Sequence, residues 1–276
     1  MSQLIQFYAG VMANTLGNHA SLSQVLSELF QHSQTAFLSI VDRSGSRLAA
    51  TNAMPSEALS PPAPLLDAIN TAKELLTIQA SVASEAANTA APQETVDAAA
   101  VAAKLVEPML ASIAATEETI AADRLARKAG DSQVDAIIVR VNSLERILEL
   151  LAPHSFAEAV SAGVRQKLDE AIQQLVGADY ANLLSASGLS TLLEAGSNPP
   201  EATVNRAMGH FTDTFLSSST FLASPLLERM ASPRIRSDAH HRALQKLART
   251  YEELSQDKQG APWRSATDVR MLLGVE

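Results

Sequence analysis

Apolar side chains recur at alternating spacings of three and four residues between residues 134 and 151, the strongest regular pattern in the chain. An α-helix has about 3.6 residues per turn, so this spacing places the apolar side chains along one helix face. The seam lasts fewer than three heptads, which is too short for a free-standing coiled coil. We therefore expect a helix that packs within a bundle. The seam consists of Val134, Ile137, Val141, Leu144, Leu148 and Leu151.

The amino-acid composition extends this expectation to the whole chain. Hydrophobic residues make up 46% of the 276 residues, and much of that fraction is Ala and Leu, whereas aromatic residues make up only 4%. Ala and Leu have the highest helix propensities, and the β-branched and aromatic runs typical of strands are scarce. We predict an all-α protein of about ten helices with no sheet.

Proline, glycine and capping residues mark the ends of the expected helices. A first helix over 3–16 is expected to end at Gly17, and a longer one to cover 21–50. Pro108 lies within the helix expected over 94–128, which predicts a kink or two shorter helices. Further helices are expected over 65–78, 134–151, 155–177, 200–217, 233–254 and 265–273, with short helical turns over 181–193.

The helix expected over 155–177 carries a start signal and an end signal. Ser155 and Glu158 have the spacing of a capping box, in which the serine hydroxyl accepts from a backbone amide and the glutamate reaches back to the serine amide. Gly177 is expected to end this helix, because glycine adopts the backbone conformation that closes a helix at little cost.

Two stretches lack the composition of a packed helix. Residues 51–63 contain Pro55, Pro61 and Pro62, which predicts a surface loop. Residues 81–93 are rich in Ala, Ser and Asn and have little bulk to bury, which predicts a mobile connection. Both stretches fall within a first helical bundle expected over residues 1–130. We expect residues 131–276 to form a second, C-terminal helical bundle.

The sequence contains none of the common catalytic motifs. It has no nucleophile elbow, phosphate-binding loop, dinucleotide-binding glycine motif or H-E-x-x-H zinc motif, and it has no cysteine. Only His240 and His241 are close among six histidines, and neighbours on a helix point about 100° apart, so they would not share an ion. We interpret the histidines as surface or packing residues. We expect no enzyme activity, no cofactor and no bound metal ion.

Charge and hydropathy narrow the range of partners. The formal net charge of −9 argues against general nucleic-acid binding. We expect no membrane-spanning helix, because no apolar stretch reaches the ~18 residues that a span requires. The N-terminus lacks the pattern of a signal peptide. We therefore expect contact with a membrane only at its surface.

A locally basic stretch precedes the C-terminus. One interpretation is a contact surface for an acidic partner helix or for anionic lipid head groups. The other, which is the more common for such runs, is a solvated helix face. No aromatic side chains interleave with the charges, which argues against nucleic acid. The stretch contains Arg229, Arg234, Arg236, Arg242, Lys246 and Arg249, diluted by Asp238.

Short helix-packing motifs follow one another through nearly the whole chain. They are Leu4-Ile5-Gln6-Phe7-Tyr8, Leu105-Val106-Glu107-Pro108-Met109-Leu110, Val141-Asn142-Ser143-Leu144, Phe215-Leu216-Ser217, Pro225-Leu226-Leu227, Tyr251, and the ending Thr267, Val269, Leu272 and Leu273. In this order and spacing they resemble the C-terminal region of the sixth subunit of the conserved oligomeric Golgi complex, of fungal type. The loop over 256–263 departs from the family pattern, and residues 51–63 and 81–93 match nothing in it.

The resemblance implies a subunit of a multisubunit tethering complex of the class built from helical rods. Such a subunit would be an elongated stack of antiparallel helical bundles at the cytosolic face of the Golgi membrane. It would bind sister subunits and SNARE proteins, and the complex would capture vesicles in retrograde intra-Golgi transport and so maintain glycosylation. No catalytic or cofactor residues carry over from the family. The alternative is an unrelated all-α module that binds a protein or lipid surface through the basic C-terminal helix.

Overall fold

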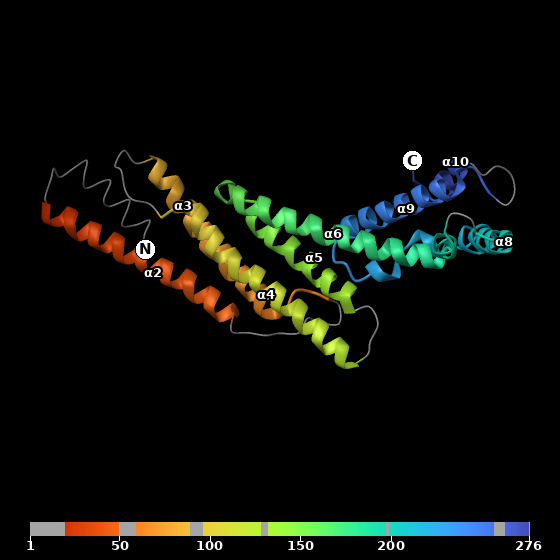
Figure 1. Ribbon diagram of the computed structural model, residues 1–276. Helices are drawn as coiled ribbons and strands as arrows, with labels where there is room; N and C mark the ends of the chain where they lie inside the picture. Colours follow the sequence, from red (N-terminus) through yellow and green to blue (C-terminus); the bar gives the residue numbers. More distant parts are fainter. Residues whose placement is uncertain are drawn as a thin grey trace. The chain divides into compact units, whose positions relative to one another are not determined.

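The computed structural model describes residues 20–49, 59–88, 96–127, 132–196, 199–256 and 263–275. These residues form nine α-helices and no strand, which confirms the all-α prediction (Figure 1). The helices are α2 (Ala20–Ala49), α3 (Ala63–Asn88), α4 (Ala98–Arg127), α5 (Ser132–Leu151), α6 (Glu158–Ala186), α7 (Ser190–Glu194), α8 (Glu201–Gly209), α9 (Pro233–Ser255) and α10 (Ala266–Leu272). The helix predicted over 3–16 and most of the loop predicted over 51–63 lie outside the described residues.

The chain divides into two compact units, and each unit is built from two separate stretches of sequence. Unit 1 comprises Met1–Gly130 and Ser143–Leu168, and unit 2 comprises Asp131–Asn142 and Asp169–Glu276. Helices α5 and α6 therefore each contribute residues to both units.

The core of unit 1 is a layer of aliphatic side chains between helices. Leu65 and Leu76 of α3 are fully buried, and they belong to one apolar cluster with Met109 of α4 and with Leu144 and Ile147 of α5. Helices α2, α3 and α4 lie against one another in this unit (Figure 1). The second half of the seam predicted on α5, Leu144, Leu148 and Leu151, therefore packs within this bundle, as expected.

Helix α4 continues through Pro108 as one helix, so the alternative of two shorter helices is wrong. The proline ring packs against Gly45 of α2, where an added Cβ atom would be 2.8 Å from Pro108 Cγ. Glycine, which has no Cβ, permits the ring to come this close to the backbone of α2. An exposed ion pair between Lys104 and Asp42, with 3.3 Å between Nζ and Oδ1, links the same two helices.

One stretch of α4, Ala98–Ala122, is long and apolar enough to cross a membrane by length and composition, with a mean hydropathy of 1.5. The prediction that no stretch passes this test is wrong, because the many alanines between the bulkier side chains raise the mean hydropathy. The bulky side chains Val101, Leu105 and Met109 recur at helical spacing and are buried in the core of unit 1. A core helix passes the same test of length and composition.

Helix α3 is longer than predicted. Residues 81–88 continue it, so the mobile connection predicted over 81–93 is wrong for these residues, and residues 89–93 lie outside the described part. Alanine favours a helix even where there is little bulk to bury. The hydroxyl of Ser81 also donates to the carbonyl of Thr77 at 3.1 Å, as serine does within a helix.

Helix α6 departs from both of its predicted end signals. A 3₁₀ turn, Ser155–Ala157, precedes α6, and the backbone N–H of Glu158 donates to the carbonyl oxygen of Ser155 and not to its hydroxyl, so the capping box is wrong. Glu158 instead accepts a hydrogen bond from Arg165 at 2.8 Å. The helix also continues through Gly177 to residue 186. A glycine inside a helix costs about 1 kcal/mol, and burial of Leu183 beyond it offsets this cost.

Unit 2 contains irregular segments beside its helices. The helix predicted over 200–217 consists of α8 followed by a π turn, His210–Phe215. Two 3₁₀ turns, Ser219–Leu222 and Pro225–Leu227, follow before α9 begins. The start predicted for α9 is confirmed, because the hydroxyl of Ser232 accepts from the backbone N–H of Ile235 and Pro233 occupies the first turn.

Candidate functional site

The six residues of the basic stretch have different environments. Arg229 precedes α9, and its guanidinium donates to the fully buried carboxylate of Asp135 on α5. Arg236 donates through Nη1 to the backbone carbonyl of Glu228 at 3.2 Å. These two side chains therefore hold the segment before α9 in place.

The other four basic residues are exposed on α9. Arg242, Lys246 and Arg249 are three and four residues apart, so they lie on one face of the helix. Arg242 forms an ion pair with Asp238 at 2.8 Å, and Glu253 is also exposed at a position on this face. The face carries both signs of charge, with an excess of positive charge. Arg234 lies in the first turn of the same helix.

Asn142 of α5 binds the backbone just before α9 through both ends of its amide. Its Oδ1 accepts from the N–H of Ala231 at 2.9 Å, and its Nδ2 donates to the carbonyl of Arg229 at 3.4 Å. The side chain of Asn142 is almost completely buried. A buried amide satisfied in this way fixes the position of an irregular segment by supplying hydrogen bonds to its backbone.

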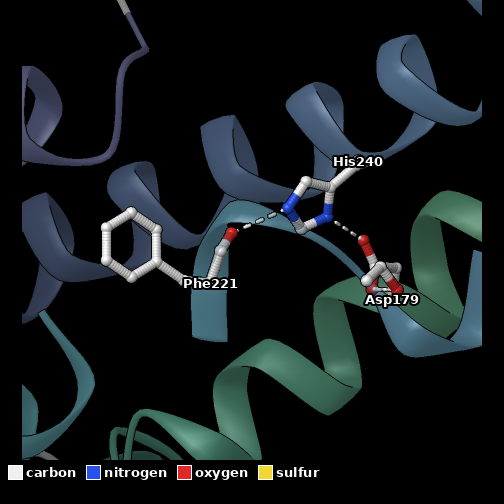
Figure 2. A network of polar contacts seen from close by, with 4 residues as sticks. Asp179, Phe221 and His240 are labelled. Carbon is white, nitrogen blue, oxygen red and sulfur yellow. Dashed lines mark hydrogen bonds and ion pairs between the residues drawn. The ribbon is translucent and has the colours of Figure 1, made fainter. Parts of the chain in front are cut away.

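A second buried polar network surrounds His240 of α9 (Figure 2). The ring nitrogen Nδ1 lies 2.7 Å from Oδ2 of Asp179 on α6, and Nε2 lies 2.8 Å from the carbonyl oxygen of Phe221. The hydroxyl of Ser224 donates to the other carboxylate oxygen, Oδ1 of Asp179, at 2.5 Å. All of these side chains are buried.

The geometry favours the doubly protonated form of His240. A carboxylate and a carbonyl oxygen both accept hydrogen bonds, so each ring nitrogen has to donate to complete its bond. Burial alone would lower the pKa of His240. The hydrogen bonds to Asp179 and to the carbonyl of Phe221, with the negative charge of Asp179, outweigh burial and raise this pKa.

The network contains the residue types of a catalytic triad but not the required order of hydrogen bonds. In such a triad the serine hydroxyl bonds to Nε2 of the histidine, which removes its proton. Here the Ser224 hydroxyl donates to Asp179, and Nε2 of His240 is hydrogen-bonded to the backbone carbonyl of Phe221. The arrangement therefore positions a segment of the chain and does not activate a nucleophile.

A row of aromatic side chains anchors the C-terminal segment in unit 2. The hydroxyl of Tyr251 donates to the carbonyl of Arg264 at 2.9 Å and accepts from its N–H at 2.8 Å. Burial raises the pKa of Tyr251. The ring of Tyr251 lies 5.9 Å from that of Trp263, so Trp263 packs beside the start of the last helix. The row runs through Trp263, Tyr251, Phe211, Phe215 and Phe221.

Sequence reasoning did not identify Asp135, Asp179 or His240 as paired residues. The sequence does contain a signal for Asp179, because it follows the apolar residues Ile172 and Val176 at helical spacing. Such spacing places the carboxylate on the apolar face of the helix, where a buried charge needs a partner. In the described part of the chain no three histidine or acidic side chains lie together as ligands for a metal ion would.

Together these contacts define an all-helical scaffold in which buried polar side chains bond to backbone groups and to one another. The family model described as "Conserved Oligomeric Golgi complex subunit 6, C-terminal" matches residues 1–261. The chain belongs to this family, which confirms the resemblance inferred from the ordered motifs.

Curated relatives show the same relationship. The chain is 25% identical over 266 residues to conserved oligomeric Golgi complex subunit 6 of Cryptococcus neoformans var. neoformans serotype D. The matched region covers 92% of this chain and 35% of the relative. It is 26% identical over 195 residues to the protein of the same name from Phaeosphaeria nodorum. That matched region covers 71% of this chain and 26% of the relative. The chain thus spans about a third or less of these relatives. No solved structure matches the chain.

Proposed function

We propose that this chain is the C-terminal part of a non-enzymatic subunit of a Golgi vesicle-tethering complex. The subunit acts in retrograde intra-Golgi transport and so maintains the distribution of glycosylation enzymes. It works as a peripheral protein at the cytosolic face of the Golgi membrane. The family match over residues 1–261 carries this proposal.

Sister subunits of the complex and SNARE proteins are the proposed partners. The name of the family describes one subunit of an oligomeric complex, which supports sister subunits as partners. Helical surfaces support the mode of binding, because Val25, Leu29 and Ile40 are each about half exposed on α2. These positions share one face of the helix, and apolar residues at such spacing are typical of helix-to-helix recognition.

Affinity capture tests this proposal. The tagged chain is incubated with cytosol and with detergent-solubilised Golgi membranes. The bound fraction is probed for the other subunits of the tethering complex and for Golgi SNAREs. We expect sister subunits to be retained, and to be lost when Val25, Leu29 and Ile40 are replaced by Asp. The matched control replaces the exposed polar residues Gln24, Gln31 and Thr35 of the same helix by Asp. Retention of no sister subunit by the unmodified chain would contradict the proposal.

A second function, binding to an anionic surface, is favoured by the exposure of Arg242, Lys246 and Arg249 on one face of α9. Flotation with liposomes tests it, using vesicles with and without acidic lipid. Strong binding that requires acidic lipid and is abolished by R242E, K246E and R249E would support a lipid-surface module. Equal behaviour of the two kinds of vesicle would exclude it.

A further inference from the structure

We propose that His240 is a pH-sensitive latch that holds residues 219–227, here called the strap, against α6 and α9 while its ring carries two protons. Loss of one proton releases the strap. The residues that form the latch all belong to unit 2, and the proposal goes beyond the tethering function proposed above.

The two hydrogen bonds of the ring explain why the latch responds to a single proton. Oδ2 of Asp179 lies 2.7 Å from Nδ1 and the carbonyl oxygen of Phe221 lies 2.8 Å from Nε2, and neither oxygen can donate a hydrogen bond. A neutral imidazole has one N–H, so it satisfies only one of these two acceptors. The other nitrogen then directs a lone pair at an oxygen in a buried site, where an unmade hydrogen bond is costly.

The strap is connected to this switch at two points. Phe221 supplies the carbonyl, and Ser224 supplies a hydroxyl that donates to Asp179 at 2.5 Å. The ring of Phe221 is buried and lies 5.5 Å from that of Phe215 in the aromatic row. Figure 2 shows His240 between the strap and α6. Weakening the His240 bonds therefore loosens an apolar contact as well as a polar one.

The charged groups around His240 support its control by Asp179. Asp179 is the ionisable group that faces the ring from α6, and the strap contains no ionisable residue. On α9 itself, Arg236 bonds to the carbonyl of Glu228, and Asp238 and Arg242 pair with each other at the surface. Tyr180, next to Asp179 on α6, hydrogen-bonds to Thr250 at 2.8 Å.

The sign of the pH effect follows from the raised pKa of His240 in the folded chain. The protonated ring binds better in the folded state than in the unfolded state. Its contribution to stability is therefore complete below the ordinary histidine pKa of about 6.5 and is lost as the pH rises through the raised value. The strap is expected to be held at mildly acidic pH and released at alkaline pH.

Nuclear magnetic resonance of the full chain tests the latch directly. We expect both ring nitrogens of His240 to be protonated at pH 6 and the ring to titrate above 6.5. Amide exchange in residues 221–227, corrected for the intrinsic effect of pH, is expected to accelerate about tenfold or more across that titration. A midpoint at or below 6.5, or unchanged exchange in the strap, would overturn the proposal.

Two variants provide a matched comparison. H240Q is expected to remove the dependence of strap exchange on pH, whereas H241Q, which changes the exposed neighbouring histidine, is expected to retain it. A dependence that persists in H240Q would assign the effect to another group. If H240Q does not fold, the titration of His240 in the unmodified chain still decides the proposal.

Discussion

Asn142 and Ser143 are adjacent buried polar residues on α5, yet their side chains have opposite situations. The amide of Asn142 has hydrogen-bond partners at both ends, in the backbone of residues 229 and 231. The hydroxyl of Ser143 is buried without a hydrogen-bond partner in the described structure. A buried polar atom without a hydrogen-bond partner lowers the stability of the folded state. Removing one partner of a buried hydrogen bond creates this situation for the partner that remains.

These two side chains give a paired prediction. Asn142→Ala is expected to lower the free energy of unfolding by about 1–3 kcal/mol, because it leaves the N–H of Ala231 and the carbonyl of Arg229 without their bonds. Ser143→Ala is expected to be neutral or to stabilise the chain slightly, because it removes an unsatisfied hydroxyl. Urea unfolding of both variants measures the difference. Equal losses in the two variants would contradict this account.

Patterns formed by residues close together in the sequence could be predicted, whereas polar contacts between residues far apart in the sequence could not. The apolar seam of α5 and the Ser232-Pro233 start of α9 are local patterns, and both were predicted correctly. The partners of His240 lie on α6 and in the strap, and the partner of Arg229 is Asp135, far away in the sequence. No local pattern specifies such pairs. The sequence therefore presents the basic residues as one patch, although Arg229 is held by a buried carboxylate.

Helix ends were the least predictable feature at the level of elements. Gly177 and the serines after residue 80 are end signals by composition, but the helices continue through them. Packing of Leu183 and the helix propensity of alanine outweigh the local signals there. Helix contacts also involve single positions, such as Gly45 against Pro108, which sequence periodicity does not reveal.

Replacement of glycine by alanine is expected to have opposite effects at two positions, one in the contact between α2 and α4 and one on the exposed surface of α6. Gly45→Ala is expected to destabilise unit 1 by about 1–3 kcal/mol, because the new methyl group would overlap the Pro108 ring. Gly163→Ala is expected to stabilise by about 0.5–1 kcal/mol, because this exposed position on α6 has open space around it and alanine favours a helix. Thermal unfolding measures both. Stabilisation by Gly45→Ala would show that α2 does not approach α4 so closely.

The attachment of α10 gives a prediction about one hydroxyl. Tyr251→Phe retains the ring but removes both hydrogen bonds to the backbone of Arg264. Amide exchange within α10 is therefore expected to accelerate, with a loss of about 1–2 kcal/mol in local stability. Tyr180→Phe is the control, because the hydroxyl of Tyr180 bonds to Thr250 and not to the C-terminal segment. Acceleration in both variants would mean that the effect is not specific to Arg264.

At the scale of the whole molecule, the two units are interleaved in the sequence. Residues Ser143–Leu168 belong to unit 1, although they follow a stretch that belongs to unit 2. Leu144, Ile147 and Leu151 join the apolar cluster that also contains α3 and α4 side chains. A cut between residues 130 and 131 therefore separates these side chains from their partners.

This interleaving predicts the behaviour of a fragment of residues 131–276. We expect the fragment to expose apolar surface and to bind a hydrophobic dye much more strongly than the full chain, because Leu144, Ile147 and Leu151 lose their neighbours. Replacing these three residues by Gln in the fragment is expected to reduce the dye signal. Dye binding equal to that of the full chain would indicate that the fragment buries these residues by itself.

The interleaving also sets an order of events during synthesis on the ribosome. The helices of the first 130 residues emerge before Ser143–Leu168, so the core of unit 1 cannot close until residue 168 has been added. Until then the apolar faces of α3 and α4, which carry Leu76 and Met109, lack the side chains of α5 that cover them. A nascent chain with such faces is a substrate for chaperones. We therefore expect the interval of exposure to chaperones during translation to be set by where α5 and α6 occur in the sequence.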